Sequence, residues 1–117
     1  MESININEIL AQQEKERIEI LEKSNRAHSA LALAKMALEH SGGGSHAAAK
    51  LLLSMQHGTD FDFQLLLKFD TTNRAHADLV MMGYRAHEIW PSSWLDDIGE
   101  NGADIMNKLS TKWAENS

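Results

Sequence analysis

Residues 27–55 read AHSALALAKMALEHSGGGSHAAAKLLLSM, and this stretch decides the fold. Its first half carries alanine and leucine at helical spacing, which predicts a helix with an apolar face of small residues. That face consists of Ala27, Ala30, Leu31, Ala34, Ala37 and Leu38. Gly42, Gly43 and Gly44 end this helix, and Ser45 is a favourable N-cap for a second helix that reaches about Gln56. The second helix is apolar on almost every side, so we expect it to be central and buried.

The sequence of residues 60–91 predicts two more helices. A short one is capped by Asp60 or Asp62, and a longer one runs from Asp70 to about Trp90, where Pro91 stops it. No window alternates apolar and polar residues for long enough to predict a strand. The side chains of the short helix that we expect to face the core are Leu65, Leu66, Leu67 and Phe69.

The C-terminal part contains all three tryptophans. Residues 92–102 are predicted to form a loop or a single turn that holds Trp94, and residues 103–114 a last amphipathic helix. Tryptophans at helical spacing are most often core residues, and this interpretation is favoured for Trp90, Trp94 and Trp113. The alternative is that Trp94 is an exposed anchor for a partner. The core side chains expected on the last helix are Ile105, Met106, Leu109 and Trp113.

The N-terminal segment raises a question of length. Asn5 and Glu8 have the spacing of a capping box, and a helix continuous over residues 5–40 is about 54 Å long at 1.5 Å per residue. A compact domain of this size is only about 35 Å across. We therefore favour a helix that overhangs the core, although Ser24 and Asn25 could cap a new helix and let the first fold back. The apolar residues that an overhang leaves to be covered by a second copy or another protein are Ile4, Ile6, Ile9, Leu10, Ile18, Ile20 and Leu21.

Together these patterns predict an all-α protein, a compact bundle of about five helices with a long N-terminal helix. At 117 residues the chain fits one domain. We divide it into a helical arm, residues 1–23, for self-association or partner binding, and a helical core, residues 24–117.

The composition excludes or disfavours several classes of function. The chain has no cysteine, which excludes disulfides and thiolate chemistry. It shows neither a secretory signal pattern nor the ~20 apolar residues that cross a bilayer, so we expect a cytoplasmic protein. The net charge of -6 divides into -3 for residues 1–14, +1 for residues 15–87 and -4 for residues 88–117. Without a basic stripe, nucleic-acid binding is disfavoured, whereas acidic ends suit solubility or a basic partner.

The six histidines do not have the spacing of a metal or catalytic site. His76 and His87 share a helical face but lie about 16 Å apart, too far for one ion. His40 and His46, or His57 with neighbouring aspartates, could form only a weak surface site. The glycine run lacks the strand and the lysine of a phosphate-binding loop. We therefore predict no catalytic, cofactor-binding or metal-binding residues.

One short repeat is present. Asn25-Arg26-Ala27-His28 recurs as Asn73-Arg74-Ala75-His76, with Arg85-Ala86-His87 as a partial third copy. Chance is the favoured explanation, because the flanking helical units do not match. The alternative is a repeated recognition face of arginine and histidine.

Several motifs carry a resemblance to a known family. They are the glycine/serine turn before residues 47–53, Met55-Gln56-His57-Gly58, Phe61-Asp62-Phe63 with Leu66, Asp70, Asp78-Leu79 and residues 109–113. With these, the chain resembles a family of small bacterial proteins found in chromosomes, prophages and conjugative elements. The sequence departs from the family's more acidic turn around Gln64, and the arm lies outside the shared region. The resemblance implies a compact helical fold and a mobile-element origin, and it implies no catalytic residues.

The leading hypothesis is a non-catalytic protein–protein interaction protein. A concrete form is a phage or conjugative-element accessory factor that inhibits a host defence complex, such as an anti-CRISPR. We expect a protein partner, with a homodimer through the N-terminal helix as one form. The alternatives are a small nucleic-acid-associated regulator and a histidine-dependent metal enzyme. The candidate partner-binding residues are Ile6, Ile9, Leu10, Arg17, Arg26, Arg74, Arg85 and Trp94.

Overall fold

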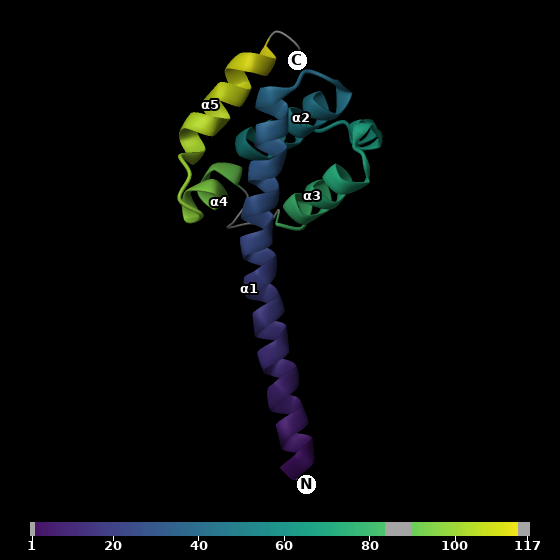
Figure 1. The fold of residues 1–117 in the computed structure, drawn as a ribbon, viewed down its shortest axis with the longest axis vertical. Coiled ribbons are helices and arrows are strands. Elements are labelled where there is room, and N and C mark those ends of the chain that lie inside the picture. The colour runs from purple at the N-terminus through teal and green to yellow at the C-terminus, as the bar shows by residue number, and fades with distance from the viewer. Residues whose placement is uncertain (1, 84–89, 115–117) are drawn as a thin grey trace.

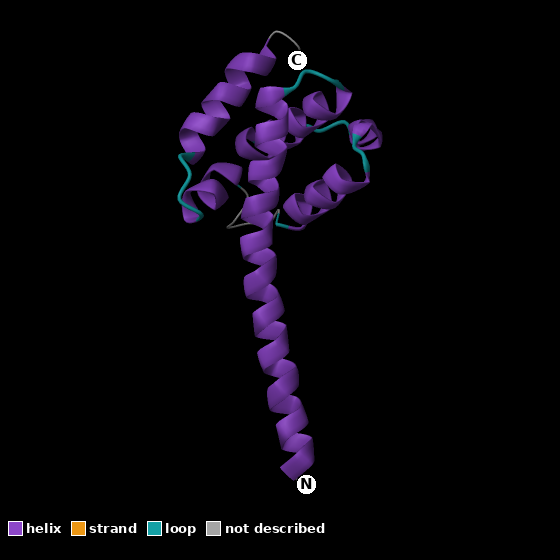
Figure 2. Ribbon diagram, viewed as in Figure 1, coloured by secondary structure: helices purple, strands orange, loops and turns teal. Residues whose placement is uncertain are grey.

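A computed structural model describes the backbone of residues 2–83 and 90–114, and the side chains of residues 7–15, 25–83 and 90–114. Every regular element in these residues is a helix, which confirms the all-α class (Figure 2). In chain order the elements are α1 (Glu2–Glu39), α2 (Gly43–His57), the 3-10 helix η1 (Phe63–Lys68), α3 (Thr71–Met82), α4 (Pro91–Asp97) and α5 (Gly102–Trp113). Within the described ranges, no helix is both long and apolar enough to span a bilayer.

Helix α1 is continuous over 38 residues, about 57 Å at the standard rise. Its C-terminal half lies among the other helices, and its N-terminal half extends away from them (Figure 1). The molecule consequently measures 64 × 28 × 24 Å along its principal axes. Each side chain described between residues 7 and 15 is exposed, whereas the first buried side chain of the described part of α1 is that of Arg26.

The core forms around α1 and α2, which contact each other and the helices α3, α4 and α5. The small-residue face predicted for α1 is buried at Ala27, Ala30, Ala34 and Ala37, together with Leu33. Helix α2 is buried as predicted, and it contributes three successive alanines and two leucines. These residues are Ala47, Ala48, Ala49, Leu51 and Leu52. Because alanine is short, the two helix axes can approach closely.

Several helix ends agree with the predictions. Asp62 accepts a hydrogen bond from the Gln64 amide and caps η1, and Asp70 caps α3 in the same way through the amide of Asn73. Gly58 ends α2 in the left-handed conformation, with φ of 68°.

Other helix ends differ from the predictions. Helix α1 begins at Glu2, so Asn5 lies within it and is not its N-cap. Helix α2 begins at Gly43, and Ser45 inside it donates its hydroxyl proton to the Met36 carbonyl. This bond ties the second helix to the end of the first. Helix α3 ends at Met82, before the predicted end, and residues 84–89 lie outside the described residues.

The first part of the segment predicted to be a loop or a single turn, residues 92–102, belongs to the helix α4, Pro91–Asp97. Pro91 is its first residue, where the missing amide proton is not needed and the fixed φ suits a helix. The proline therefore starts a helix here. Leu65 and Leu66 of η1 and Phe69 directly after it are half-buried as expected, whereas Leu67 is exposed. Met106, Leu109 and Trp113 of α5 are buried as predicted.

The C-terminal end of α1 is held by α5. The Lys112 ammonium donates to the carbonyls of Ala37 and Leu38, at 2.7 and 3.0 Å, and to that of His40. The Trp113 indole also donates to the Ala37 carbonyl, at 3.0 Å. These carbonyls lie where a helix has no amides left to pair with them and where its dipole is negative. A cation at this position therefore satisfies both needs.

Replacing this lysine should destabilise the fold. We expect Lys112→Met to lower the free energy of unfolding by about 1–3 kcal/mol, because charged hydrogen bonds to the helix end are lost. Lys108→Met on the same helix is the control, since Lys108 forms only an exposed ion pair with Asp104. It should cost about 0.5 kcal/mol or less. Urea unfolding of both variants measures the difference, and equal costs would contradict the capping role.

Helices α4 and α5 meet at a glycine. A Cβ atom built on Gly102 would lie 2.0 Å from the Ser92 carbonyl oxygen, and the Gly102 amide donates to Asp96 at 2.8 Å. The backbones of the two helices thus approach at a distance that only glycine permits.

Gly102→Ala should therefore strain this contact and lower the thermal midpoint, with a cost of about 1–3 kcal/mol. Gly43→Ala is the matched control, because its added Cβ would meet only the flexible Lys68 side chain, at 3.5 Å. We expect that variant to change stability by less than about 1 kcal/mol. Differential scanning calorimetry compares the two, and a Gly102→Ala midpoint equal to that of the control would refute the close approach.

Candidate partner-binding surfaces

The arm presents two large apolar side chains to solvent. Ile9 and Leu10 are each 56% exposed on the part of α1 that extends from the core (Figure 1). Both belong to the predicted partner-binding residues. The side chains of Ile6 and Arg17, which were predicted with them, lie outside the described residues.

Arg26 is buried, which corrects its prediction as a partner-binding residue. Only 5% of it is exposed, and its guanidinium carbon lies 5.7 Å from the centre of the Trp94 ring. This is a cation–π distance. Gly83 provides the space, because a Cβ there would come within 2.0 Å of the Arg26 side chain. The arginine therefore joins α1 to α4 and the end of α3.

Trp94 is 4% exposed and belongs to the core, so the choice of Trp94 as an exposed partner-binding anchor is also wrong. The favoured interpretation of a core tryptophan holds for Trp94 and Trp113. It fails for Trp90, which is half exposed at the start of α4. The physical reason for the burial of Trp94 is that residues 91–97 form a helix, whose inner side faces Arg26. A loop would not fix the Trp94 ring in this direction.

The repeated tetrads lie on α1 and α3, which pack together, but their arginines are not equivalent. Arg74 is exposed and forms an i,i+4 ion pair with Asp78 at 3.0 Å, whereas Arg26 is buried. Arg85 lies outside the described residues. His28 and His76 line one hollow between α1 and α3, and His76 Nδ1 is 2.9 Å from the Ser29 hydroxyl oxygen.

The described residues contain no group of three or more histidine, aspartate or glutamate side chains placed to hold a metal ion. His46 instead stacks on Trp113, with ring centres 5.5 Å apart. His57 is exposed at the end of α2.

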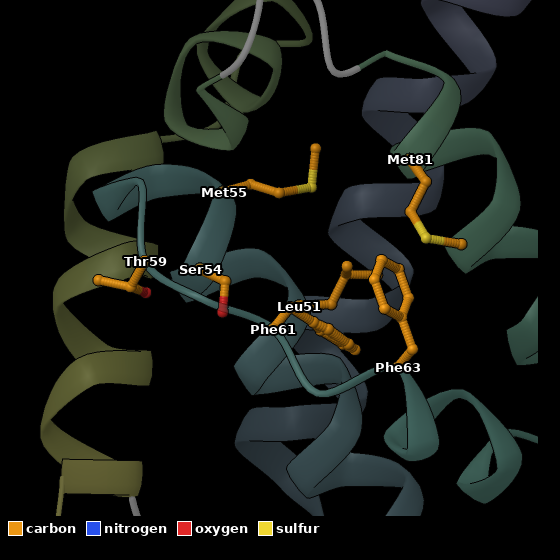
Figure 3. Close-up of a pocket in the computed structure, with 7 residues that line it drawn as sticks. All are labelled: Leu51, Ser54, Met55, Thr59, Phe61, Phe63 and Met81. Carbon is orange, nitrogen blue, oxygen red and sulfur yellow. The ribbon is translucent and has the colours of Figure 1, made fainter.

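An apolar pocket of about 270 Å³, which no sequence pattern predicted, is formed by α2, α3, η1 and the loop before η1 (Figure 3). Phe61 and Phe63 form one wall, with ring centres 6.0 Å apart in an edge-to-face arrangement. Met55 and Met81 lie across the space from them. The remaining lining residues are Leu51, Ser54 and Thr59.

Large apolar side chains are exposed in the pocket lining and next to one lining residue in the chain. Phe63 is 74% exposed, and Met82, next to Met81, is 56% exposed. The sequence did contain a signal, because Asp60-Phe61-Asp62-Phe63 alternates two carboxylates with two aromatic residues just before and at the start of η1. The packing of α3 against α2, which closes the pocket, cannot be read from that motif.

A scan against protein-family models, a search of curated proteins and a search of solved structures each found no match to the chain.

Proposed function

We propose that the protein is a non-catalytic interaction protein whose arm, residues 1–23, captures a protein partner while residues 24–117 form the folded base. The observation that carries the proposal is the exposure of Ile9 and Leu10 on the extended half of α1. Covering such side chains on binding removes apolar area from water, which contributes about 25 cal/mol per Å².

The arm is also prepared for binding. A free helix must form a costly first turn, whereas the arm continues a helix already held in the core by α2, α3, α4 and α5. A partner therefore meets a recognition helix whose ordering cost is already partly met by folding. Insertion of an amphipathic helix into a groove and pairing with another helix are the two modes that suit it.

A second copy of the chain is one candidate partner, and the charges of the arm favour an antiparallel pairing of the two arms. Residues 1–14 hold three acids and no base, whereas residues 15–23 hold three acids and three bases. Parallel arms would place the two acidic tips side by side. Antiparallel arms place each acidic tip beside residues 15–23, whose charges cancel, which is the less repulsive arrangement.

The finer form of the proposal is a mobile-element accessory factor that inhibits a host defence complex, such as an anti-CRISPR. It is supported by the family resemblance and by the negative charge at both ends of the chain, -3 in residues 1–14 and -4 in residues 88–117. Such charge suits a basic channel that otherwise holds nucleic acid.

The proposal predicts that two arm substitutions abolish capture. Full-length Ile9→Glu/Leu10→Glu should recover at least about tenfold less partner than the unmodified chain in a tagged pull-down from the native host, read by mass spectrometry. The control is Asn7→Glu/Ala11→Glu, which adds charge to exposed residues on another face of the same turns. Equal recovery with both double variants would contradict the proposal. Recovery of the chain alone would leave a second copy as the partner, and light scattering would then have to show a dimer that only Ile9→Glu/Leu10→Glu dissolves.

Removing residues 1–23 should leave the core folded and abolish self-association or capture. The described side chains of residues 7–15 are all exposed, so their loss removes little buried area. Circular dichroism during thermal unfolding should still show one cooperative transition for residues 24–117. A transition that becomes broad and non-cooperative would show that the arm belongs to the core.

A further inference from the structure

The pocket between α2 and α3 lies in the folded base and is separate from the arm. Its volume of about 270 Å³ is below the ~300–1,000 Å³ usual for small-molecule and cofactor sites. The lining is mostly aromatic, aliphatic and thioether groups, and Ser54 already donates its hydroxyl proton to the Asp60 carbonyl. A space of this size and character suits one bulky apolar side chain.

The lining residues are of the kinds found at adaptable protein-binding surfaces. Met55 and Met81 are unbranched and flexible, so they can adjust to the shape of an inserted side chain. Phe63 offers a ring that is 74% exposed and already packed on one edge by Phe61. An aromatic ring that is positioned but uncovered is typical of interface residues that carry binding energy.

Two carboxylates, Asp60 and Asp62, belong to the loop before η1 that forms one side of the pocket. The basic residues next to the pocket-forming segments in the chain are Lys50, Lys68 and Arg74, and the Lys68 side chain lies beside Gly43 at the start of α2. Asp78 is paired with Arg74, and Asp60 also lines a neighbouring hollow with Lys50. Asp60 and Asp62 directly flank Phe61 in the chain and are both exposed. An apolar pocket with an acidic border is complementary to an apolar anchor with basic neighbours.

We propose that this pocket binds a basic segment of another protein, which inserts one bulky apolar side chain while its lysines or arginines face Asp60 and Asp62. The arm of a second copy is a poor occupant, because residues 1–14 bring three further acids and no base to an acidic border. The contact is therefore distinct from the one made by the arm.

The test uses the full-length chain and a fluorescein-labelled peptide in which a central tryptophan has two lysines on each side. Fluorescence anisotropy should show binding at least about tenfold tighter than for peptides with glutamates in place of the lysines or alanine in place of the tryptophan. Binding of the three peptides with equal affinity, or no binding of the lysine peptide up to about 1 mM, overturns the proposal.

Matched variants locate the contact. Phe63→Ser should weaken peptide binding at least about fivefold, whereas Leu67→Ser, an equally exposed change on the same 3-10 helix but outside the pocket, should change it less than about twofold. Asp60→Asn/Asp62→Asn should also weaken it, and asparagine retains the oxygen that caps η1. Circular dichroism confirms that these variants fold. Equal effects of Phe63→Ser and Leu67→Ser overturn the proposal.

Two competitors test the other occupants. Free indole should not displace the labelled peptide at concentrations where unlabelled lysine peptide does, and a peptide of residues 1–15 should not displace it at all. Displacement by indole alone, unaffected by Asp60→Asn/Asp62→Asn, would make the pocket a small-molecule site. Displacement by the residue 1–15 peptide would make it a contact between copies. Either result replaces the basic-segment proposal.

Discussion

Close packing between helices α1 and α2 is the constraint on which the rest of the structure depends. Ala30, Ala34 and Ala37 on one helix and Ala47–Ala49 on the other are fully or almost fully buried. Short side chains bring the two backbones near each other, and the remaining helices are then arranged around this pair. A larger side chain at a buried position where α1 faces α2 would push the two helices apart and loosen the contacts made around them.

The two ends of the folded base are joined through the same pair. Lys112 and Trp113, near the end of the described chain, bind the carbonyls at the end of α1, and His46 at the start of α2 stacks on Trp113. Long-range contacts of this kind make the core cooperative, since loss of α5 would expose both a helix end and an aromatic surface. Arg26, under Trp94, connects the opposite end of this half of α1 to α4.

Local rules recovered most of the helices but few of the contacts between them. Caps at Asp62 and Asp70 and the left-handed Gly58 follow from chemistry within a few residues. The role of Pro91 was misread because a proline that stops one helix and a proline that starts another are the same signal without tertiary context. Arg26 was predicted to bind a partner, but it is buried beside the Trp94 ring, and this contact between α1 and α4 cannot be read from either segment alone. The pocket was missed for the same reason, because it exists only where α3 meets α2.

The unbroken backbone of α1 also fixes the direction in which the arm faces. Each residue of an α-helix turns by about 100° and advances 1.5 Å, so Ile9 and Leu10 point along bearings set by their distance in residues from the alanines buried at 27–37. Adding one residue to α1 between Leu10 and Ala27 would rotate the arm's apolar side chains by about 100° relative to the folded base. Adding seven would return them to within about 20° of their bearing and carry them about 10 Å further out. The number of residues between the arm and the base thus sets the angle at which the arm's apolar side chains face. The affinity of a rigid partner that contacts both the arm and the base would therefore vary periodically with the number of inserted residues, with the period of the helix.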